Sequence, residues 1–187
     1  APILLDVKSS EAALRLVESA GAAAQIWKTG HSHMKKRMKE LEAPLAGEMS
    51  GHIFIADDYL GFDDAIYAAV RVITQMVKGG QSITEFMDSL PEQHATPELR
   101  IDCPDTVKFD SMEKIRAHVL SGHDAADVNS IDGVRVRSGD GWWLIRASNT
   151  EAALVARAEA ADRTALDRLL SDIETTLAAA GLDWKRP

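Results

Sequence analysis

The first third of the chain alternates short apolar runs with helical patterns, and this alternation constrains the fold more than any other feature. Residues 3–7, 24–27 and 45–46 are apolar enough for buried strands. Residues 10–21 and 32–41 lie between them and have the spacing of amphipathic helices. Strand–helix–strand alternation predicts βαβ units, and therefore an α/β domain with a mainly parallel sheet and helices on both faces.

The next segment continues the same domain. Residues 52–55 read as another strand, and residues 63–79 as a helix that Gly79 and Gly80 end. Apolar residues at helical spacing predict a buried stripe on this helix, made by Ile66, Val70, Ile73 and Val77. A short helix over residues 83–90 then ends at Pro91.

The character of the chain changes near residues 92–97, which are poor in apolar side chains and flanked by prolines. We therefore predict two domains, 1–94 and 95–187. The second reads as strand, helix, three strands and helix, which predicts a small antiparallel α+β domain. Its expected strands are 99–103, 134–137, 142–146 and 153–159, and its expected helices are 111–120 and 165–180.

Composition excludes several classes of protein. The formal net charge is −8, and both halves are acidic, which argues against nucleic-acid binding. No apolar run approaches the roughly 20 residues of a membrane span. The single cysteine, Cys103, permits no intrachain disulfide and fits a reducing, cytoplasmic location. The chain opens inside an apolar run without a methionine, so we expect it to be a piece of a longer protein.

Polar residues follow the predicted strands of the first domain. Lys8, His31 and Glu48 each come after a strand, so we expect all three at the edge of the sheet where ligands of such folds collect. The segment Gly47–His52 adds Ser50 and His52, and its two glycines let a ligand approach the backbone. These donors and acceptors suit a hydroxyl-rich ligand, although a solvated turn is the alternative.

A second polar segment, residues 146–150, ends an apolar strand of the second domain. It combines the guanidinium of Arg146 with the side chains of Ser148, Asn149 and Thr150. A planar guanidinium fork matches phosphate oxygens, and Arg157 on the next strand offers a second cation. The segment therefore predicts anion binding, with an ordinary hairpin turn as the alternative. The carboxylate of Glu151 would repel a phosphate unless it points away from it.

The histidines allow a metal hypothesis. His31, His33, Glu48 and His52 could supply zinc ligands, as in a metal-dependent hydrolase. However, neither a His-Glu-x-x-His helix nor a Cys-x-x-Cys pair is present. We therefore expect no metal site in this chain.

Five motifs in order resemble the α-D-phosphohexomutase family, and within it the phosphomannomutase/phosphoglucomutase branch. The resemblance covers nearly the whole chain. Gly47–His52 is similar to the sugar-binding loop of that family, and residues 146–150 followed by Arg157 are similar to its phosphate-binding loop. Lys28–His31, Asp6–Lys8 and Gly61–Asp64 also match.

The resemblance implies a place within a four-domain isomerase. Residues 1–94 would be its domain 3, and residues 95–187 its TBP-like domain 4. Such enzymes interconvert hexose 1-phosphate and hexose 6-phosphate through a bisphosphorylated sugar and a phosphoserine. They are cytoplasmic, use Mg²⁺ held in domain 2, and respond to an activator of the glucose 1,6-bisphosphate type. The implied partners are mannose or glucose phosphates and the missing domains 1 and 2.

The resemblance also implies residue roles. Glu48, Ser50 and His52 would bind sugar hydroxyls, while Lys8 and His31 would line the reacting end as cation and proton carrier. The non-reacting phosphate would be held by Arg146, Ser148, Asn149 and Thr150, with Arg157 in support. The chain lacks the Asp-Gly-Asp-x-Asp-Arg metal loop and the Ser-His phosphoserine signature, so it should be inactive alone.

Two alternatives remain open beside this reading. Phosphoglucosamine mutases usually have Gln where this chain has Met49, and their phosphate loop differs from Ser148–Thr150. A non-catalytic sugar-phosphate binding module is the other alternative. The chain also departs from its own branch at Ala152, where proline is common.

Overall fold

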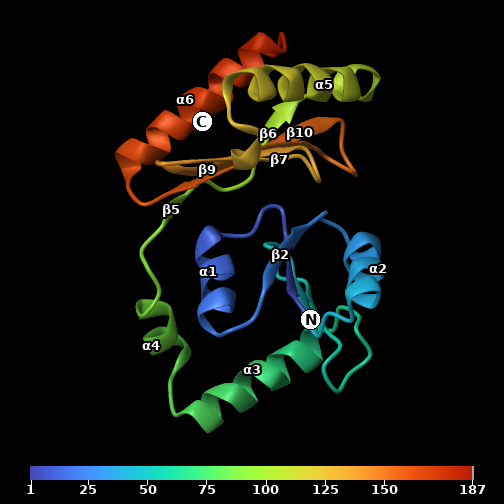
Figure 1. Ribbon diagram of the computed structural model, residues 1–187, viewed down its shortest axis with the longest axis vertical. Helices are drawn as coiled ribbons and strands as arrows, with labels where there is room; N and C mark the ends of the chain where they lie inside the picture. Colours follow the sequence, from blue (N-terminus) through green and yellow to red (C-terminus); the bar gives the residue numbers. More distant parts are fainter. Residues whose placement is uncertain (187) are drawn as a thin grey trace. The chain divides into compact units, whose positions relative to one another are not determined.

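The computed structural model describes residues 1–186 and shows two compact units, Ala1–Pro91 (unit 1) and Glu92–Pro187 (unit 2) (Figure 1). The boundary between the two units along the chain lies three residues before the predicted one. The predicted fold class is confirmed: unit 1 has a mainly parallel sheet and unit 2 an antiparallel sheet, each with helices. Within residues 1–186, no helix combines the length and apolar character needed to cross a membrane.

Unit 1 is built on a four-stranded sheet in the order β2-β1-β3-β4. β1 runs parallel to both β2 and β3, whereas β4 returns antiparallel to β3. Because β1, β2 and β3 run parallel to one another, their carboxyl ends lie at the same edge of the sheet. Their bounds are Ile3–Asp6 for β1, Ala24–Trp27 for β2, Leu45–Gly47 for β3 and Ile53–Ile55 for β4.

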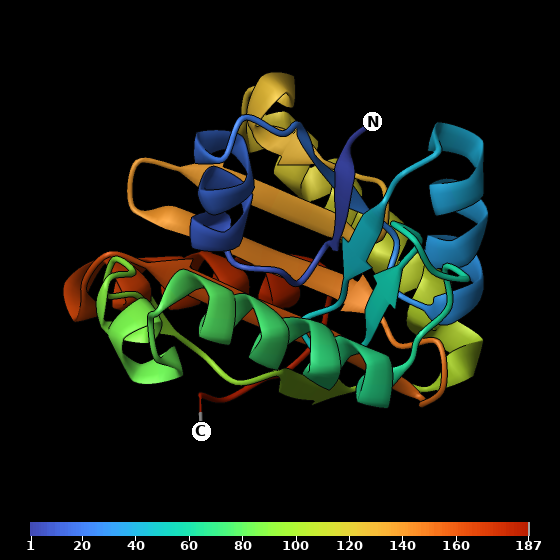
Figure 2. The ribbon, with the colours of Figure 1, turned by 90° about the horizontal axis from the view of Figure 1, so that it is seen from below.

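The crossover helices lie on opposite faces of this sheet. α1 (Glu11–Ser19) leads from β1 out to β2, and α2 (His31–Leu41) leads back past β1 to β3. Because both crossovers of a parallel sheet are right-handed, their opposite directions put the helices on opposite sides (Figure 1 and Figure 2). The buried side chains Met34 and Met38 of α2 pack with Leu4 and Phe54 of the sheet.

The predicted buried stripe of the third helix is wrong. In α3 (Ala65–Gly79), Ile66 is 81 % exposed and Val77 is 78 % exposed, and Val70 and Ile73 are exposed as well. Helical periodicity identifies an apolar face but not what covers it, and α3 is apolar on two sides. The side that faces the sheet carries Ala68, Val72 and Met76. With Ile3, Leu45, Ile53 and Phe86 these side chains line an apolar groove of about 690 Å³.

Unit 2 contains a six-stranded antiparallel sheet in the order β5-β10-β9-β8-β7, in which β6 also pairs with β10. The predicted strands and closing helix are present. The strands are β5 (His94–Ala95), β6 (Leu99–Asp102), β7 (Val128–Asn129), β8 (Val134–Ser138), β9 (Gly141–Ala147) and β10 (Ala153–Ala160). The helices are α4 (Ile83–Asp88) in unit 1, and α5 (Asp105–Gly122), a short 3-10 turn (Ala125–Asp127) and α6 (Arg163–Ala179) in unit 2.

Two details of unit 2 differ from the sequence prediction. β5 and β7 are two residues long, too short to leave an alternating pattern. α5 begins at Asp105, before the predicted start at residue 111. Its first turns carry Val107 and Phe109 on the exposed side, whereas Ile115 and Val119 are buried, so the apolar residues do not form one stripe.

The two faces of the second sheet have different characters. Trp143 and Ile145 of β9 belong to the apolar core with Ile115 of α5 and Leu169 of α6, and both helices cover this face (Figure 1). The alternate residues of β9, ending with Arg146, point to the other face. Because Arg146 pairs with Val155, two residues before Arg157, the two arginines share that face.

The turn before β8 requires a glycine. Gly133 has φ +85°, and a Cβ there would lie 2.3 Å from the carbonyl oxygen of Ile145 and 2.7 Å from Cα of Arg146. We expect Gly133→Ala to destabilise unit 2 by more than about 2 kcal/mol, because backbone strain and a backbone clash add. Hydrogen exchange of β8–β10 measures the loss. The control is Gly139→Ala, where a Cβ meets nothing within 4 Å, and equal protection in both variants would contradict the prediction.

Candidate functional site

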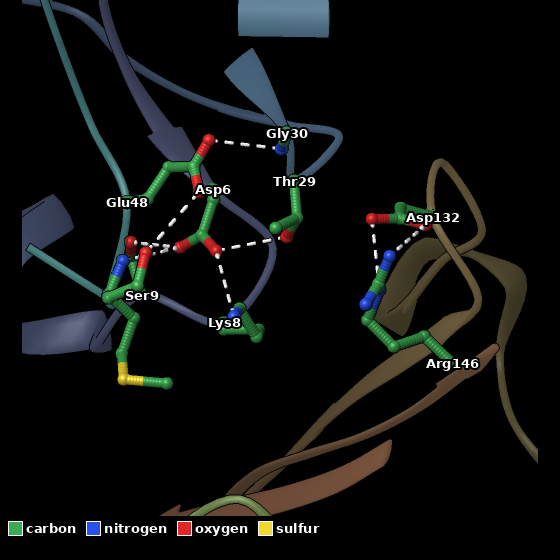
Figure 3. Close-up of polar contacts among 10 residues, drawn as sticks. Asp6, Lys8, Ser9, Thr29, Gly30, Glu48, Asp132 and Arg146 are labelled. Atoms are coloured by element: carbon green, nitrogen blue, oxygen red, sulfur yellow. Dashed lines mark hydrogen bonds and ion pairs between the residues drawn. The ribbon is translucent and has the colours of Figure 1, made fainter. Parts of the chain in front are cut away.

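The carboxylate of Asp6 joins three loops at the carboxyl edge of the first sheet. Asp6 is fully buried at the end of β1. Its Oδ1 accepts hydrogen bonds from the Ser9 hydroxyl (2.7 Å) and the Met49 amide (3.1 Å), and its Oδ2 accepts one from the Thr29 hydroxyl (3.0 Å). These partners come from the loops after β1, β3 and β2, and Figure 3 shows them around the carboxylate.

Lys8 lies in the same network. Its Nζ is 4.0 Å from Oδ2 of Asp6, and its side chain is largely buried. The ion pair fixes where this cation sits, because a buried ammonium stays close to a carboxylate. The structure thus places Lys8 at the sheet edge at which the sequence predicted it.

Glu48 is held by the loop that precedes α2. Its Oε1 accepts a hydrogen bond from the Gly30 amide (3.0 Å), as Figure 3 shows, and its Oε2 accepts one from the Ser50 hydroxyl (3.4 Å). A carboxylate at the N-terminus of a helix is favoured by the helix dipole. Gly51, with φ +89°, closes the tight turn in which the Glu48 amide donates to the His52 carbonyl at 2.9 Å. The predicted sugar loop is therefore a fixed structure.

His31 and His52 converge on Asp63. Nδ1 of His52 lies 2.7 Å from Oδ2 of Asp63, and Nε2 of His31 lies 3.7 Å from the same oxygen. The two imidazole rings meet edge to face with centroids 4.4 Å apart, and His31 also packs against Phe54. A carboxylate accepts, so Nδ1 of His52 donates in this hydrogen bond.

The loop that carries Asp63 is itself anchored. Oδ1 of Asp63 accepts from the Ile53 amide (3.2 Å). The next residue, Asp64, caps α3 by accepting from the Tyr67 amide (2.9 Å). A hydrogen bond from the Tyr59 hydroxyl, together with that amide, lowers the pKa of Asp64 below its ordinary value. These bonds fix the side of the site formed by residues 59–67.

In unit 2, the guanidinium of Arg146 is oriented by Asp132. Nε of Arg146 donates to Oδ2 of Asp132 (3.1 Å), and Nη2 donates to Oδ1 (3.4 Å), as Figure 3 shows. Arg146 is only 5 % exposed. A paired, buried guanidinium keeps one orientation, which is a requirement for bidentate recognition of an oxyanion.

Hydrogen bonds from α5 support the loop that follows Arg146. The buried Lys108 of α5 donates from Nζ to the carbonyl oxygens of Ser148 (3.0 Å) and Glu151 (2.9 Å). The Ser148 hydroxyl accepts from the amides of Thr150 (3.4 Å) and Glu151 (3.2 Å). With its oxygen used by these two amides, the Ser148 hydroxyl is set to donate its own proton to an anion.

The carboxylate of Glu151, which would repel a phosphate, is engaged elsewhere. It forms an ion pair with Arg100 of β6. Asn149 and Thr150 are exposed at the tip of the loop. Arg157 lies on the same face of the sheet as Arg146, with its guanidinium 5.8 Å from the Trp142 ring and 4.0 Å from Glu159. The predicted anion residues therefore lie on β9, on β10 and in the loop between these two strands of unit 2.

Sequence reasoning missed four residues that organise these groups. The sequence identifies Asp6 and Asp63 only as parts of motifs, although an acidic residue at the end of a strand or just before a helix is a usable signal. Nothing in the sequence pattern points to Asp132 as the partner of Arg146. Lys108 lies in the part of α5 that the sequence did not predict, so no signal identified it.

The described residues do not fit Mg²⁺. Within residues 1–186, the side chains that could surround a metal ion are His31, His52 and Asp63, which offer two imidazole nitrogens and one carboxylate. Mg²⁺ requires nearly octahedral oxygen ligands, so this set does not match it.

Comparison with known proteins identifies both units. Residues 1–94 match the family "Phosphoglucomutase/phosphomannomutase, alpha/beta/alpha domain III", and residues 98–176 match "Phosphoglucomutase/phosphomannomutase, C-terminal domain". A phosphomannomutase/phosphoglucomutase of Pseudomonas putida is 42 % identical over 177 residues, which is 95 % of this chain and 38 % of that protein. The chain thus spans well under half the length of this relative.

Solved structures give the same relationship. A phosphoglucomutase/phosphomannomutase family protein from Burkholderia thailandensis superimposes with a TM-score of 0.86 at 37 % identity, over 98 % of this chain and 39 % of its own. The N-acetylphosphoglucosamine mutase of Aspergillus fumigatus shares the fold at 14 % identity (TM-score 0.64, 96 % of this chain and 39 % of its own). It has been solved with GlcNAc-6P and magnesium, and also with glucose 1,6-bisphosphate. The chain belongs to the phosphoglucomutase/phosphomannomutase family and corresponds to its domain III and C-terminal domain.

Proposed function

We propose that this chain is the part of a hexose-phosphate mutase that binds the sugar hydroxyls and the non-reacting phosphate. The full-length enzyme would interconvert the 1-phosphate and 6-phosphate of mannose or glucose through a bisphosphorylated sugar. The observation that carries the proposal is the buried guanidinium of Arg146, oriented by Asp132, in a chain of this family.

The phosphate role follows from the charges around the loop of residues 146–151. Arg146 and Lys108 are buried cations that form ion pairs with Asp132 and Asp105, and the carboxylate of Glu151 is paired with Arg100. A phosphate at the loop would accept hydrogen bonds from the guanidinium and from the Ser148 hydroxyl. Asn149, Thr150 and Arg157 would complete the donors.

The sugar role follows from the fixed loop of residues 47–52. Glu48 and Ser50 present acceptors and a donor, and adjacent sugar hydroxyls require such a set. Lys8 adds a cation at the same edge of the sheet. Because the Asp6 network and the Gly30 amide hold these side chains, the loop binds without first having to become ordered.

The role of proton carrier, which the family resemblance implies for His31, fits His52 better. A sugar hydroxyl that attacks a phosphoryl group loses its proton, and a positioned imidazole can accept it. Asp63 lies 2.7 Å from Nδ1 of His52, whereas Nε2 of His31 is 3.7 Å away from it. His52 would accept the proton on Nε2, with the resulting imidazolium stabilised by Asp63 and with His31 packed beside it.

The proposal predicts binding without turnover. In a titration followed by NMR, this chain should bind mannose 6-phosphate and glucose 6-phosphate, with shifts at residues 146–151, and inorganic phosphate should compete. A coupled mutase assay should detect no turnover, because the chain contains neither a phosphoserine signature nor the Asp-rich metal loop. Binding confined to N-acetylglucosamine 6-phosphate would favour the phosphoglucosamine branch. Turnover by this chain alone, or shifts elsewhere, would contradict the proposal.

A further inference from the structure

We propose that His31, His52 and Asp63 form a binding site for a zinc-type divalent cation. The ligand atoms of these three side chains lie within 4.8 Å of one another. Two neutral imidazoles and one carboxylate are a ligand set that zinc accepts, with water in the fourth position. Magnesium and calcium prefer oxygen ligands, so the same set discriminates against them.

The observed distances suit tetrahedral coordination. With zinc–ligand bonds near 2.1 Å, neighbouring ligand atoms of a tetrahedron are about 3.4 Å apart. The two distances to Oδ2 of Asp63, 2.7 Å from His52 and 3.7 Å from His31, lie on either side of that value. Small rotations of the side chains would therefore admit the ion, which would displace the proton on Nδ1 of His52.

The backbone positions of the three ligands are fixed. His31 is the first residue of α2, and its ring packs against the buried Phe54. His52 directly precedes β4, and Asp63 forms an isolated β-bridge with Phe54 while its Oδ1 accepts from the Ile53 amide. Such supporting contacts orient metal ligands and raise affinity.

Solvent can reach the site. The side chains of His31 and His52 are 48 % and 44 % exposed, and that of Asp63 is 22 % exposed. A metal ion can therefore enter, and water can complete its coordination. An ion held there would occupy the imidazole of His52 and would inhibit the proton transfer described above. That consequence rests on the proposed function, whereas metal binding itself does not.

The test is a titration of this chain with Zn²⁺ in metal-free buffer at neutral pH, followed by calorimetry and by ¹⁵N NMR of the histidine rings. We expect one zinc ion per chain, with ring-nitrogen shifts confined to His31 and His52 among the six histidines. Millimolar Mg²⁺ should produce neither heat nor shifts. The ring shifts are read on the unaltered chain, so they do not depend on whether a variant folds.

Variants then assign the ligands. His31→Asn, His52→Asn and Asp63→Asn should each weaken zinc binding at least tenfold. His33→Asn and His118→Asn, which alter exposed histidines outside the cluster, should leave it unchanged. Absence of zinc binding, shifts at the other histidines, or full affinity in the His31 and His52 variants would each overturn the proposal. Because no sugar is present, failure here leaves the proposed function untouched.

Discussion

Arg146→Ala is expected to weaken sugar-phosphate binding by more than about 1.5 kcal/mol, which is at least a tenfold loss of affinity. A hydrogen bond to a charged group contributes about 1.5–3 kcal/mol. The substitution also removes the guanidinium that faces Asp132, so a carboxylate would then repel the incoming anion. Arg146→Lys should give an intermediate loss, because an ammonium keeps the charge but loses the planar fork. NMR titration with glucose 6-phosphate measures the affinity.

The matched control is Arg116→Ala, which removes the same charge from an exposed position on α5. It should bind like the unaltered chain, and hydrogen exchange of β9 and β10 in both variants would verify that unit 2 is folded. If Arg146→Ala binds as tightly as the unaltered chain, the phosphate does not bind at residues 146–151. A similar loss of affinity in both variants would instead indicate a non-specific effect of charge.

Much of the fold could be predicted from local patterns in the sequence. The alternation over residues 3–47 predicted the parallel sheet because short apolar runs separated by capped helices have few other solutions. The prediction that the apolar stripe of α3 is buried was wrong because local pattern does not show what covers a helix. Periodicity fixes which residues share a face of a helix, but coverage depends on neighbours that no single segment encodes. β5 and β7 were not predicted, because two residues are too few to show an alternating pattern.

The polar loop residues of the candidate site could be predicted from the sequence, whereas the residues that support them could not. Glu48, Ser50 and Arg146 stand in polar, glycine-rich or turn-rich segments that pattern analysis can find. Asp132 contacts Arg146 across 14 positions, and Lys108 contacts Ser148 across 40. Such long-range contacts follow from the sheet topology and leave no local signal.

Asp6→Ala is expected to have the largest effect on unit 1, destabilising it by about 3 kcal/mol or more. Removing one partner from a buried charged network typically costs about 3–5 kcal/mol, because the groups left behind remain desolvated. Here those groups include the Ser9 hydroxyl, the Thr29 hydroxyl and the Met49 amide. Asp6→Asn keeps one acceptor oxygen and should cost less. Hydrogen exchange of β1–β3 gives the opening free energies.

Two controls separate this network from a general loss of charge or of one bond. Asp88→Ala removes a carboxylate from an exposed position on α4 and should leave exchange in β1–β3 unchanged. Ser9→Ala removes a single partner and should cost about 1 kcal/mol. Because the Asp6 carboxylate accepts hydrogen bonds from the loops after β1, β2 and β3, exchange should also rise at Thr29 and Met49 in Asp6→Ala. Unchanged protection there would mean that these loops hold their positions without the Asp6 carboxylate.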